Sequence, residues 1–217
     1  MIDRKAAKAT PPELRSPLQG MSPVMTVSST GARRGVVLAE QPARTVVQII
    51  ARRGKASLTV AALRTHFGLT ATEVPTWSQR DGLAVVWSGP GQWLLTATAA
   101  DGPAIEIKAK AALADLASLS DQSHARVHLQ VTGPSVRDAL AKLVAIDLDA
   151  VIFSVGAVAM TGLAQIPIHI WRLDDGLEGS VFEIAGPQSY AASLWHHVVV
   201  AASEYGLDTR PIAPMLS

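Results

Sequence analysis

The sequence predicts an α+β fold composed of two related α/β halves with antiparallel or mixed sheets. Three observations support this prediction. The chain has 217 residues, of which 48% are apolar, so it can bury a sizeable core. Segments in which polar and apolar residues alternate are followed by segments with apolar residues at helical spacing. This order of strand, glycine and helix occurs twice, from Thr45 and from Ser120, which indicates two halves of similar plan.

The first half is predicted at 44–119, after an extended basic N-terminal arm at 1–43. It begins with a strand at 45–52, which Gly54 ends, and a helix follows that stops at Phe67. The arm is rich in proline, serine and threonine and holds no aromatic residue. Such a composition cannot bury enough apolar surface to fold alone, so the arm is expected to become ordered only against another surface.

The rest of the first half is predicted to be a hairpin and a helix. Gly89-Pro90-Gly91 separates two apolar runs, which indicates a tight turn within a hairpin at 83–98. Trp87 and Trp93 flank this turn and are expected to pack across the hairpin. A helix is predicted from Pro103 through Leu119, since proline is favoured in the first turn of a helix.

The second half, at 120–206, contains the clearest element of the chain, a strand at 124–131. Polar and apolar residues alternate along it, which is typical of a strand with one buried face. The polar set is His124, Arg126, His128 and Gln130. This polar face is expected to meet solvent or another subunit. Gly133 and Pro134 end the strand, and a short helix follows.

Three more strands and a final helix complete the second half. The strands are predicted at 157–163, 166–173 and 181–184. The acidic segment 174–179 lacks the ligand spacing of a calcium loop and is predicted to be a polar turn. The helix is predicted at 188–205 and ends at Gly206. Residues 207–217 are expected to form a C-terminal tail.

Charge is distributed unevenly along the chain. Residues 1–55 hold ten basic and three acidic residues, a net +7, whereas residues 56–217 hold nine and fifteen, a net −6. A basic arm on an acidic body favours an electrostatic contact. The first aromatic residue is Phe67, so the arm offers no base stacking and nucleic acid is not an expected partner. No apolar run approaches the roughly 18 residues of a membrane span, and no signal peptide is recognised, so a cytoplasmic location is expected.

Motifs for catalysis are missing from the sequence. The absence of cysteine excludes disulfides, thiolate zinc sites and a cysteine nucleophile. Phosphate-binding glycine loops and a nucleophile elbow are also absent. The adjacent histidines His196 and His197 lie on different faces of a helix, so no metal site is predicted. Asp121 is spaced to orient His124 as an acid–base pair, but neither a nucleophile nor a second carboxylate accompanies them.

A subunit interface is the favoured interpretation of the polar residues. The candidate interface residues are Asp121, His124, Arg126, His128 and Arg15. No catalytic, cofactor-binding or metal-binding residue is predicted in this chain.

Five short motifs, in order along the chain, resemble the gamma subunits of heterotetrameric sarcosine oxidases. The motifs are Arg15-Ser16-Pro17-Leu18, Trp87-Ser88-Gly89-Pro90-Gly91-Gln92-Trp93-Leu94, Ser120-Asp121-Gln122-Ser123-His124, Gly133-Pro134-Ser135-Val136-Arg137 and Ser189-Tyr190-Ala191-Ala192-Ser193-Leu194-Trp195. Together they cover the chain from about Arg15 to Gly206. The serine- and threonine-rich stretch at 20–34 departs from the family pattern and is interpreted as an insertion.

The resemblance implies a subunit of an oxidoreductase acting on CH–NH donors that demethylates sarcosine to glycine. It also implies the folate-binding-type fold of aminomethyltransferases. In this family FAD, FMN, NAD and the tetrahydrofolate site belong to the alpha and beta subunits and zinc to the delta subunit. The gamma subunit carries no known catalytic residue. The expected partners are therefore the alpha, beta and delta subunits, and the one-carbon unit is expected to pass to tetrahydrofolate and electrons to oxygen.

Three alternatives remain open at this point. The first is a free-standing folate-binding protein similar to aminomethyltransferases, which needs a deep pocket with an acidic residue at the pterin. Asp121 and Glu183 are the only acids proposed for that role. The second is the equivalent subunit of N-methylglutamate dehydrogenase. The third, a nucleic-acid-binding module that uses the basic arm, is disfavoured because stacking residues are missing.

Overall fold

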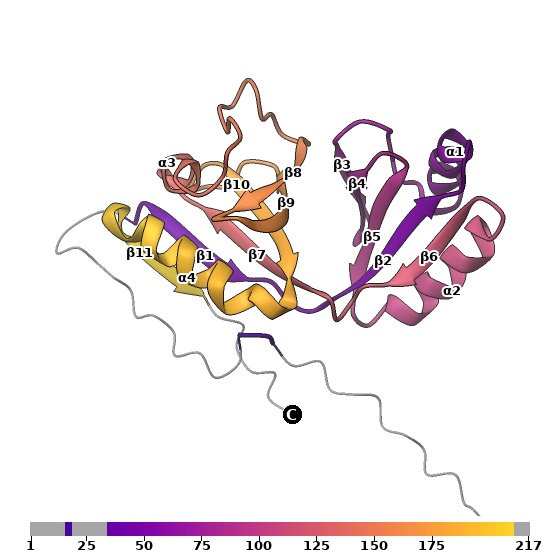
Figure 1. The fold of residues 1–217 in the computed structure, drawn as a ribbon, viewed down its shortest axis with the longest axis horizontal. Coiled ribbons are helices and arrows are strands. Elements are labelled where there is room, and N and C mark those ends of the chain that lie inside the picture. Colours follow the sequence, from indigo (N-terminus) through magenta and orange to yellow (C-terminus); the bar gives the residue numbers. More distant parts are fainter. Residues whose placement is uncertain (1–15, 19–33, 211–217) are drawn as a thin grey trace, which may run out of the picture.

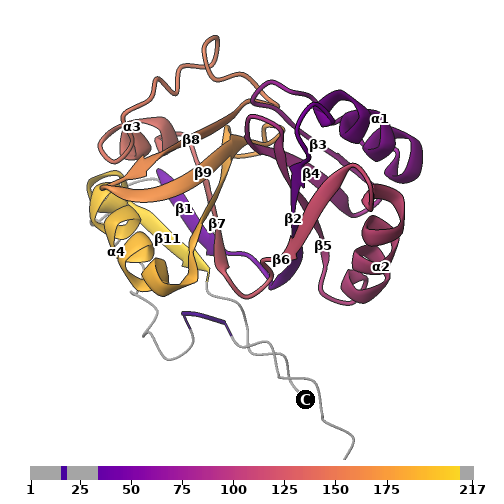
Figure 2. The same cartoon turned by 45° about the vertical axis from the view of Figure 1, so that its right-hand side comes forward.

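The computed structural model of the chain describes residues 16–18 and 34–210. Two β-sheets face each other, and two α-helices cover the outer side of each sheet (Figures 1 and 2). The described chain therefore forms four layers, in the order helices, sheet, sheet, helices. The predicted α+β class with antiparallel and mixed sheets is confirmed.

One sheet has six strands, in the order β11-β1-β7-β10-β9-β8. Its strands are β1 (Val36–Glu40), β7 (Arg126–Thr132), β8 (Val158–Leu163), β9 (Ile166–Arg172), β10 (Val181–Pro187) and β11 (Leu207–Arg210). All neighbours are antiparallel except β1 and β11, which pair in parallel with Val36 opposite Leu207. The predicted strand at 124–131 is thus confirmed as β7, the third strand of a mixed sheet.

The other sheet has five strands, in the order β3-β4-β5-β2-β6, and is antiparallel throughout. Its strands are β2 (Arg44–Ala51), β3 (Trp77–Arg80), β4 (Leu83–Gly89), β5 (Gln92–Thr98) and β6 (Ala117–Asp121). The predicted hairpin at 83–98 is confirmed as β4 and β5. Trp87 lies opposite Trp93 in its register, as expected.

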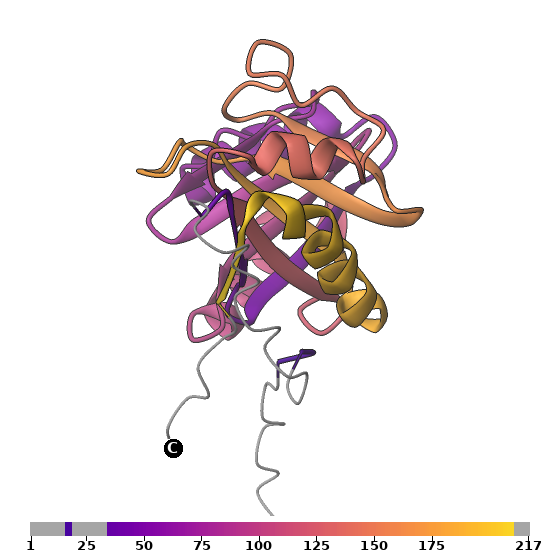
Figure 3. The same ribbon diagram turned by 90° about the vertical axis from the view of Figure 1, so that its left-hand side faces the viewer.

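Four α-helices pack against the outer sides of the sheets. They are α1 (Ala56–Phe67) and α2 (Gly102–Leu113) on the five-stranded sheet, and α3 (Val136–Ala141) and α4 (Ala191–Ala202) on the six-stranded sheet. Short 3₁₀ turns at Gln188–Tyr190 and Ser203–Tyr205 flank α4. Gly68 ends α1 in the left-handed conformation, with a φ of 67°. The α4 helix lies along the outer side of the six-stranded sheet (Figure 3) and buries an apolar stripe that includes Leu194, Val198 and Ala202.

The apolar core is divided between the two halves. Leu140 of α3 and Leu194 of α4 pack with Phe182 of β10 beneath the six-stranded sheet, and all three are fully buried. The five-stranded sheet has its own core, in which Trp93 of β5 clusters with Leu63 of α1 and Leu113 of α2. Each sheet therefore packs one face against its own helices, and the inner faces of the two sheets contact each other. Polar side chains of the strands also lie between these inner faces.

Three segments differ from the predictions. The arm was expected to reach residue 43, but 36–40 form β1. The tail was expected to begin at residue 207, but 207–210 form β11, which pairs with β1. Both strands therefore belong to the six-stranded sheet. The helix expected to run to residue 119 ends at Leu113, and Ala117–Asp121 form β6 beside β2. The boundary expected at 119/120 accordingly lies inside β6, a strand of the five-stranded sheet.

The physical reason for these differences is strand pairing across long separations in the chain. Because β1 and β11 lie at opposite ends of the described chain, no local sequence pattern predicts that they pair. For β6 a local signal was present: Ser118 and Ser120 are exposed, whereas Ala117 and Leu119 point inward. This is a period of two, which is typical of a strand, and the prediction of a continuous helix was wrong there.

The turn between β7 and α3 generates a stability prediction. Gly133 has a φ of 122°, and a Cβ at this position would collide with the carbonyl oxygen of Gly35. Gly133→Ala should therefore lower the free energy of unfolding by about 3 kcal/mol, because a strained backbone and a steric clash combine. Thermal unfolding followed by circular dichroism measures the effect.

Gly82→Ala is the matched control. Gly82 also has a positive φ, of 78°, but no atom lies within 4 Å of a Cβ placed there. Only the backbone strain applies, so the loss should be about 1 kcal/mol. Equal losses for the two variants would show that the contact with Gly35 adjusts without cost.

Candidate functional site

The inner faces of the two sheets meet through a small apolar contact. Its buried members from both sheets are Val46, Val86, Leu94, Val158, Trp171 and Ala185. Trp77 of β3 strengthens the contact, because its indole Nε1 donates to the carbonyl oxygen of Arg172 at 2.7 Å. A β-bridge between Thr76 and Ala157 joins the same two regions. The two halves are thus held together by both apolar packing and hydrogen bonds.

A cavity of about 420 Å³ lies beside this contact. Apolar walls come from both sheets, with Trp77 and Val86 on one side and Trp171 and Leu173 on the other. The polar lining includes Arg44, Thr96, Gln130 and Glu183. A volume of this size, with mostly apolar walls and a few polar groups, is within the range of small-molecule sites in proteins. The cavity is therefore the candidate functional site of the chain.

Glu183 is the charged residue at the centre of this site. It lies in β10, where its neighbours Phe182 and Ile184 point into the core beneath the sheet, so Glu183 points toward the other sheet. Its side chain is almost completely buried, and Oε1 accepts from Arg44 Nη1 at 2.7 Å and from His128 Nδ1 at 2.9 Å. A buried carboxylate requires such partners, because desolvating an unpaired charge costs several kcal/mol.

The three partners come from three separate strands. Arg44 begins β2 of the five-stranded sheet, whereas His128 and Glu183 lie on the neighbouring strands β7 and β10 of the six-stranded sheet. The ion pair between Arg44 and Glu183 therefore connects the two sheets. In the sequence, a glutamate between apolar residues of a strand indicates a buried carboxylate that needs a partner. The sequence does not identify Arg44 as its partner, since the two residues are far apart in the chain.

The polar face predicted for β7 does not lie in solvent along its whole length. His124 is exposed in the turn before the strand, and Arg126 is half-buried. His128 is buried, with its ring edge toward Trp171 at 6.0 Å between centroids. The expectation that this face meets solvent is wrong for His128, because the second sheet covers it. Arg15 lies outside the described residues.

Asp121 serves a structural purpose at the end of β6. Its Oδ1 accepts from the backbone N–H of Ser123 at 2.8 Å and from the Ser123 hydroxyl at 2.5 Å. These hydrogen bonds, with the side-chain bond first, lower the pKa of Asp121. Within residues 34–210 no hydrogen bond joins Asp121 to His124, so the acid–base pair considered from the sequence does not form there.

A second buried carboxylate, that of Glu40 in β1, binds a segment near the N-terminus. The Ser16 hydroxyl donates to both carboxylate oxygens of Glu40, at 2.6 and 2.7 Å, and Leu18 is buried in the core of the six-stranded sheet. Burial raises the pKa of Glu40, and the hydrogen bond from Ser16 opposes this. Part of the arm is thus received by the body of the chain itself.

Metal binding and membrane insertion find no support in the described residues. Within 16–18 and 34–210, no cluster of three potential metal ligands occurs. In the same ranges no helix combines the length and apolar character that a membrane crossing demands.

His169 makes folding stability depend on pH. Burial, followed by the positive charge of Arg126, lowers the pKa of His169 to about 4. Arg126 Nη1 lies 3.3 Å from His169 Nδ1, so a proton on the ring would face a cation. An unfolded chain titrates histidine near pH 6.5 and takes up this proton first. The free energy of unfolding should therefore fall as the pH drops from about 6.5 to 4.

Replacement of the histidine tests this assignment. His169→Asn removes the titrating group, so between pH 7 and 4.5 the variant should lose about 2 kcal/mol less stability than the wild type. Urea unfolding at several pH values measures the difference. The exposed His124→Asn is the control and should follow the wild-type curve. A His169→Asn curve parallel to the wild type would contradict the assignment.

Comparison with known proteins identifies the family of the chain. The model of the GCVT N-terminal domain matches residues 79–212. The gamma subunit of sarcosine oxidase from Corynebacterium sp. (strain U-96) is 29% identical over 88% of this chain and 91% of its own length. The gamma subunit from Arthrobacter sp. is 32% identical over 73% of this chain and 76% of its own length.

Solved structures agree with the sequence comparison. The heterotetrameric sarcosine oxidase from Corynebacterium sp. U-96, in complex with pyrrole 2-carboxylate, contains a similar chain with a TM-score of 0.76 and 29% identity. The match covers 88% of this chain and 96% of that chain. The glycine cleavage system aminomethyltransferase from Bartonella henselae shares the fold over 82% of this chain and 48% of its own, with a TM-score of 0.55 and 16% identity. The resemblance inferred from five short motifs is thereby confirmed, and the chain belongs to the family of sarcosine oxidase gamma subunits, with the fold of the GCVT N-terminal domain.

Proposed function

We propose that this chain is the non-catalytic gamma subunit of a heterotetrameric sarcosine oxidase and assembles with alpha, beta and delta subunits. The observation that carries this proposal is the likeness to a chain of the Corynebacterium oxidase over 88% of this chain and 96% of that chain. Fold alone does not imply function, but a likeness at 29% identity along almost the whole of both chains supports a shared role.

The proposed reaction of the assembled enzyme is the oxidative demethylation of sarcosine to glycine. The methyl carbon passes to tetrahydrofolate and the electrons pass to oxygen. FAD, FMN, NAD and the folate site are assigned to the alpha and beta subunits, and zinc to the delta subunit. In this proposal the chain described here binds none of these groups and has a structural role in the assembly.

The environment of Glu183 supports a role without catalysis. A general base needs a carboxylate that can accept a proton from a substrate. Oε1 of Glu183 already accepts from Arg44 and His128 inside the protein, and this oxygen is committed to holding the two sheets together. The buried residues around it are those of a packed interface between sheets.

The proposed subunit interface lies at the end of the molecule where β6 turns into β7. Asp121 and His124 are exposed there and Arg126 is half-buried, so these three side chains can contact a partner directly. His128 is buried, and its contribution is to hold Glu183 in place behind that surface. Arg15 stays part of the proposal, although it lies outside the described residues.

Coexpression with candidate partners tests the proposed function. The tagged chain should copurify in equal amounts with the products of neighbouring genes for alpha, beta and delta subunits, and the complex should oxidise sarcosine with uptake of oxygen. The isolated chain should be colourless and inactive. A flavin spectrum that survives gel filtration of the isolated chain would contradict the proposal. Oxidation of N-methylglutamate in place of sarcosine would indicate the related dehydrogenase.

A second candidate function is favoured by the cavity. It combines a buried acid, Glu183, with two tryptophans, Trp77 and Trp171, in about 420 Å³. A free-standing folate-binding protein would use such a site, with the acid accepting hydrogen bonds from the pterin ring and the indoles covering its faces.

Titration of the isolated chain with 5-formyltetrahydrofolate separates the two candidates. A non-catalytic subunit should give no saturable heat in calorimetry up to about 1 mM ligand, which corresponds to a binding free energy weaker than about −4 kcal/mol. Saturation in the micromolar range, with quenching of tryptophan fluorescence, would favour the folate-binding protein. In that case Trp77→Phe should weaken binding, whereas Trp87→Phe, outside the cavity lining, should not.

A further inference from the structure

The loop between α3 and β8 exposes an unusual amount of apolar surface. Val151, Ile152 and Val155 lie within five residues of each other and have exposed fractions of 86%, 66% and 45%. The loop projects from the end of the molecule near β8 (Figures 1 and 2). Single exposed apolar side chains are ordinary in proteins, but a contiguous group of them marks a site of interaction.

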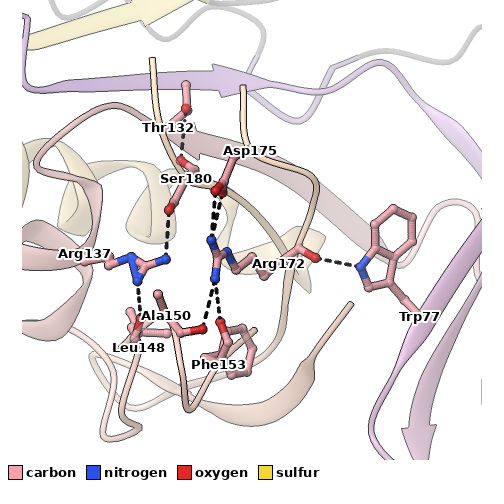
Figure 4. A network of polar contacts seen from close by, with 9 residues as sticks. All are labelled: Trp77, Thr132, Arg137, Leu148, Ala150, Phe153, Arg172, Asp175 and Ser180. Carbon is pink, nitrogen blue, oxygen red and sulfur yellow. Dashed lines mark hydrogen bonds and ion pairs between the residues drawn. The ribbon is translucent and has the colours of Figure 1, made fainter. Parts of the chain in front are cut away.

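This loop is held by a buried arginine. Arg172 at the end of β9 is 5% exposed, and its Nη1 donates to the carbonyl oxygens of Phe153 at 3.1 Å and Ala150 at 3.4 Å. Its Nη2 donates to both carboxylate oxygens of Asp175, at 2.8 and 3.1 Å. Figure 4 shows these bonds converging on the guanidinium. The backbone on both sides of Val151 and Ile152 is thereby anchored.

A second arginine fixes the start of the loop. Arg137 of α3 donates from Nη1 to the carbonyl oxygen of Leu148 at 3.0 Å and from Nη2 to Ser180 Oγ at 2.8 Å (Figure 4). Phe153 is buried and stacks on Phe182, with 6.2 Å between ring centroids. The loop thus has Val144, Leu148 and Phe153 in the core, and two arginines donate to its carbonyl groups.

Two aspartates shape the loop from within. Asp147 Oδ1 accepts from the backbone N–H of Asp149 at 2.8 Å, and Asp149 Oδ1 accepts from the backbone N–H of Val151 at 2.8 Å. Such side-chain bonds to the backbone two residues on define tight turns. The result is a loop ordered before any partner arrives, which avoids much of the entropy cost of binding.

A neighbouring loop extends the same surface. Val158 donates its N–H to the carbonyl oxygen of Pro75 at 3.0 Å, so the segment before β3 lies beside the segment before β8. Val74 in this neighbouring loop is 58% exposed. We name the combined surface the apolar–acidic edge. Its apolar members are Val74, Val151, Ile152 and Val155, and its acidic members are Glu73, Asp147 and Asp149.

We propose that the apolar–acidic edge is a docking surface for another subunit of the oxidase, which presents an apolar pocket rimmed by lysine or arginine. This inference rests on the proposed function and adds a second interface, at the end of the molecule opposite the turn between β6 and β7 (Figure 1). The segments 68–76 and 145–157 hold three acids and no basic residue or histidine, so a basic rim complements them.

The same charges disfavour two other occupants. A second copy of this chain docked by the same edge would bring like charges together in an otherwise apolar contact. A bilayer with anionic headgroups would repel the acidic rim. A different protein chain with positive charge around an apolar pocket avoids both costs, and the Corynebacterium relative belongs to a heterotetramer, in which chains of this kind adjoin others.

The test measures assembly of Ile152→Asp with the alpha, beta and delta subunits. The variant should bind the partners at least tenfold more weakly than the wild type, because a charge would enter the apolar pocket. Ile107→Asp on α2 is the matched control, since Ile107 is 70% exposed and lies outside the edge. It should bind within twofold of the wild type. Thermal unfolding of each isolated variant verifies that neither substitution unfolds the chain.

Hydrogen–deuterium exchange of the full chain gives an independent readout. Backbone amides of residues 150–156 should exchange more slowly in the assembled oxidase than in the free chain. Unchanged exchange together with wild-type assembly of Ile152→Asp would overturn the inference and leave the proposed function intact. Failure of the wild-type chain to assemble with the partners would contradict both the inference and the proposed function.

Two further outcomes identify another occupant and also overturn the inference. Slower exchange at 150–156 that depends on the concentration of the free chain indicates a second copy. If deletion of residues 1–15 speeds the exchange of amides 150–156 in the free chain, the chain's own basic segment covers the edge.

Discussion

The ion pair between Arg44 and Glu183 joins the two sheets at the point where their inner faces separate around the cavity. The six-stranded sheet has one face against helices and the other against the second sheet, so its strands have no fully solvated side. A carboxylate in such a position needs partners, because desolvation of an unpaired charge costs several kcal/mol, a large fraction of the roughly 5–15 kcal/mol by which proteins are stable. Arg44 and His128 supply those partners.

The consequence for the cavity is that its central charge is already compensated. An ion pair of this kind contributes less to stability than to arrangement, since its Coulomb energy is largely offset by desolvation. Its effect here is to hold β2 in one position against β10 and thereby to set the distance between the sheets. The tryptophan Trp77, bonded to the carbonyl oxygen of Arg172, maintains the same distance from the other side of the apolar contact.

Arg172 connects this internal arrangement with the outer surface. Its carbonyl oxygen receives Trp77 from the other sheet, while its guanidinium holds the loop that carries Val151 and Ile152. The same residue therefore stabilises the contact between the sheets and presents apolar side chains to solvent. An exposed apolar loop that a buried arginine holds in place is suited to contact with another protein, and the Corynebacterium relative is part of a heterotetramer.

Local sequence was sufficient for the elements whose pattern depends on near neighbours. The hairpin β4–β5, the helix α1 with Gly68 at its end and the alternation in β7 follow from spacing and turn chemistry alone. The family resemblance also emerged from short motifs, one of which contains the turn Gly89-Pro90-Gly91 between β4 and β5. The strand β6 was within reach of the same reasoning.

Tertiary structure alone decided which face of each strand is covered and which distant residues meet. Alternation in β7 shows that its two faces differ, but only the second sheet makes the face with His128 an interior one. Arg44 and Glu183 lie at opposite ends of the two halves in sequence, and β1 pairs with β11 from the far end of the chain. Such contacts depend on the packing of whole sheets, and a periodicity of two residues carries no information about what the sheet will pack against.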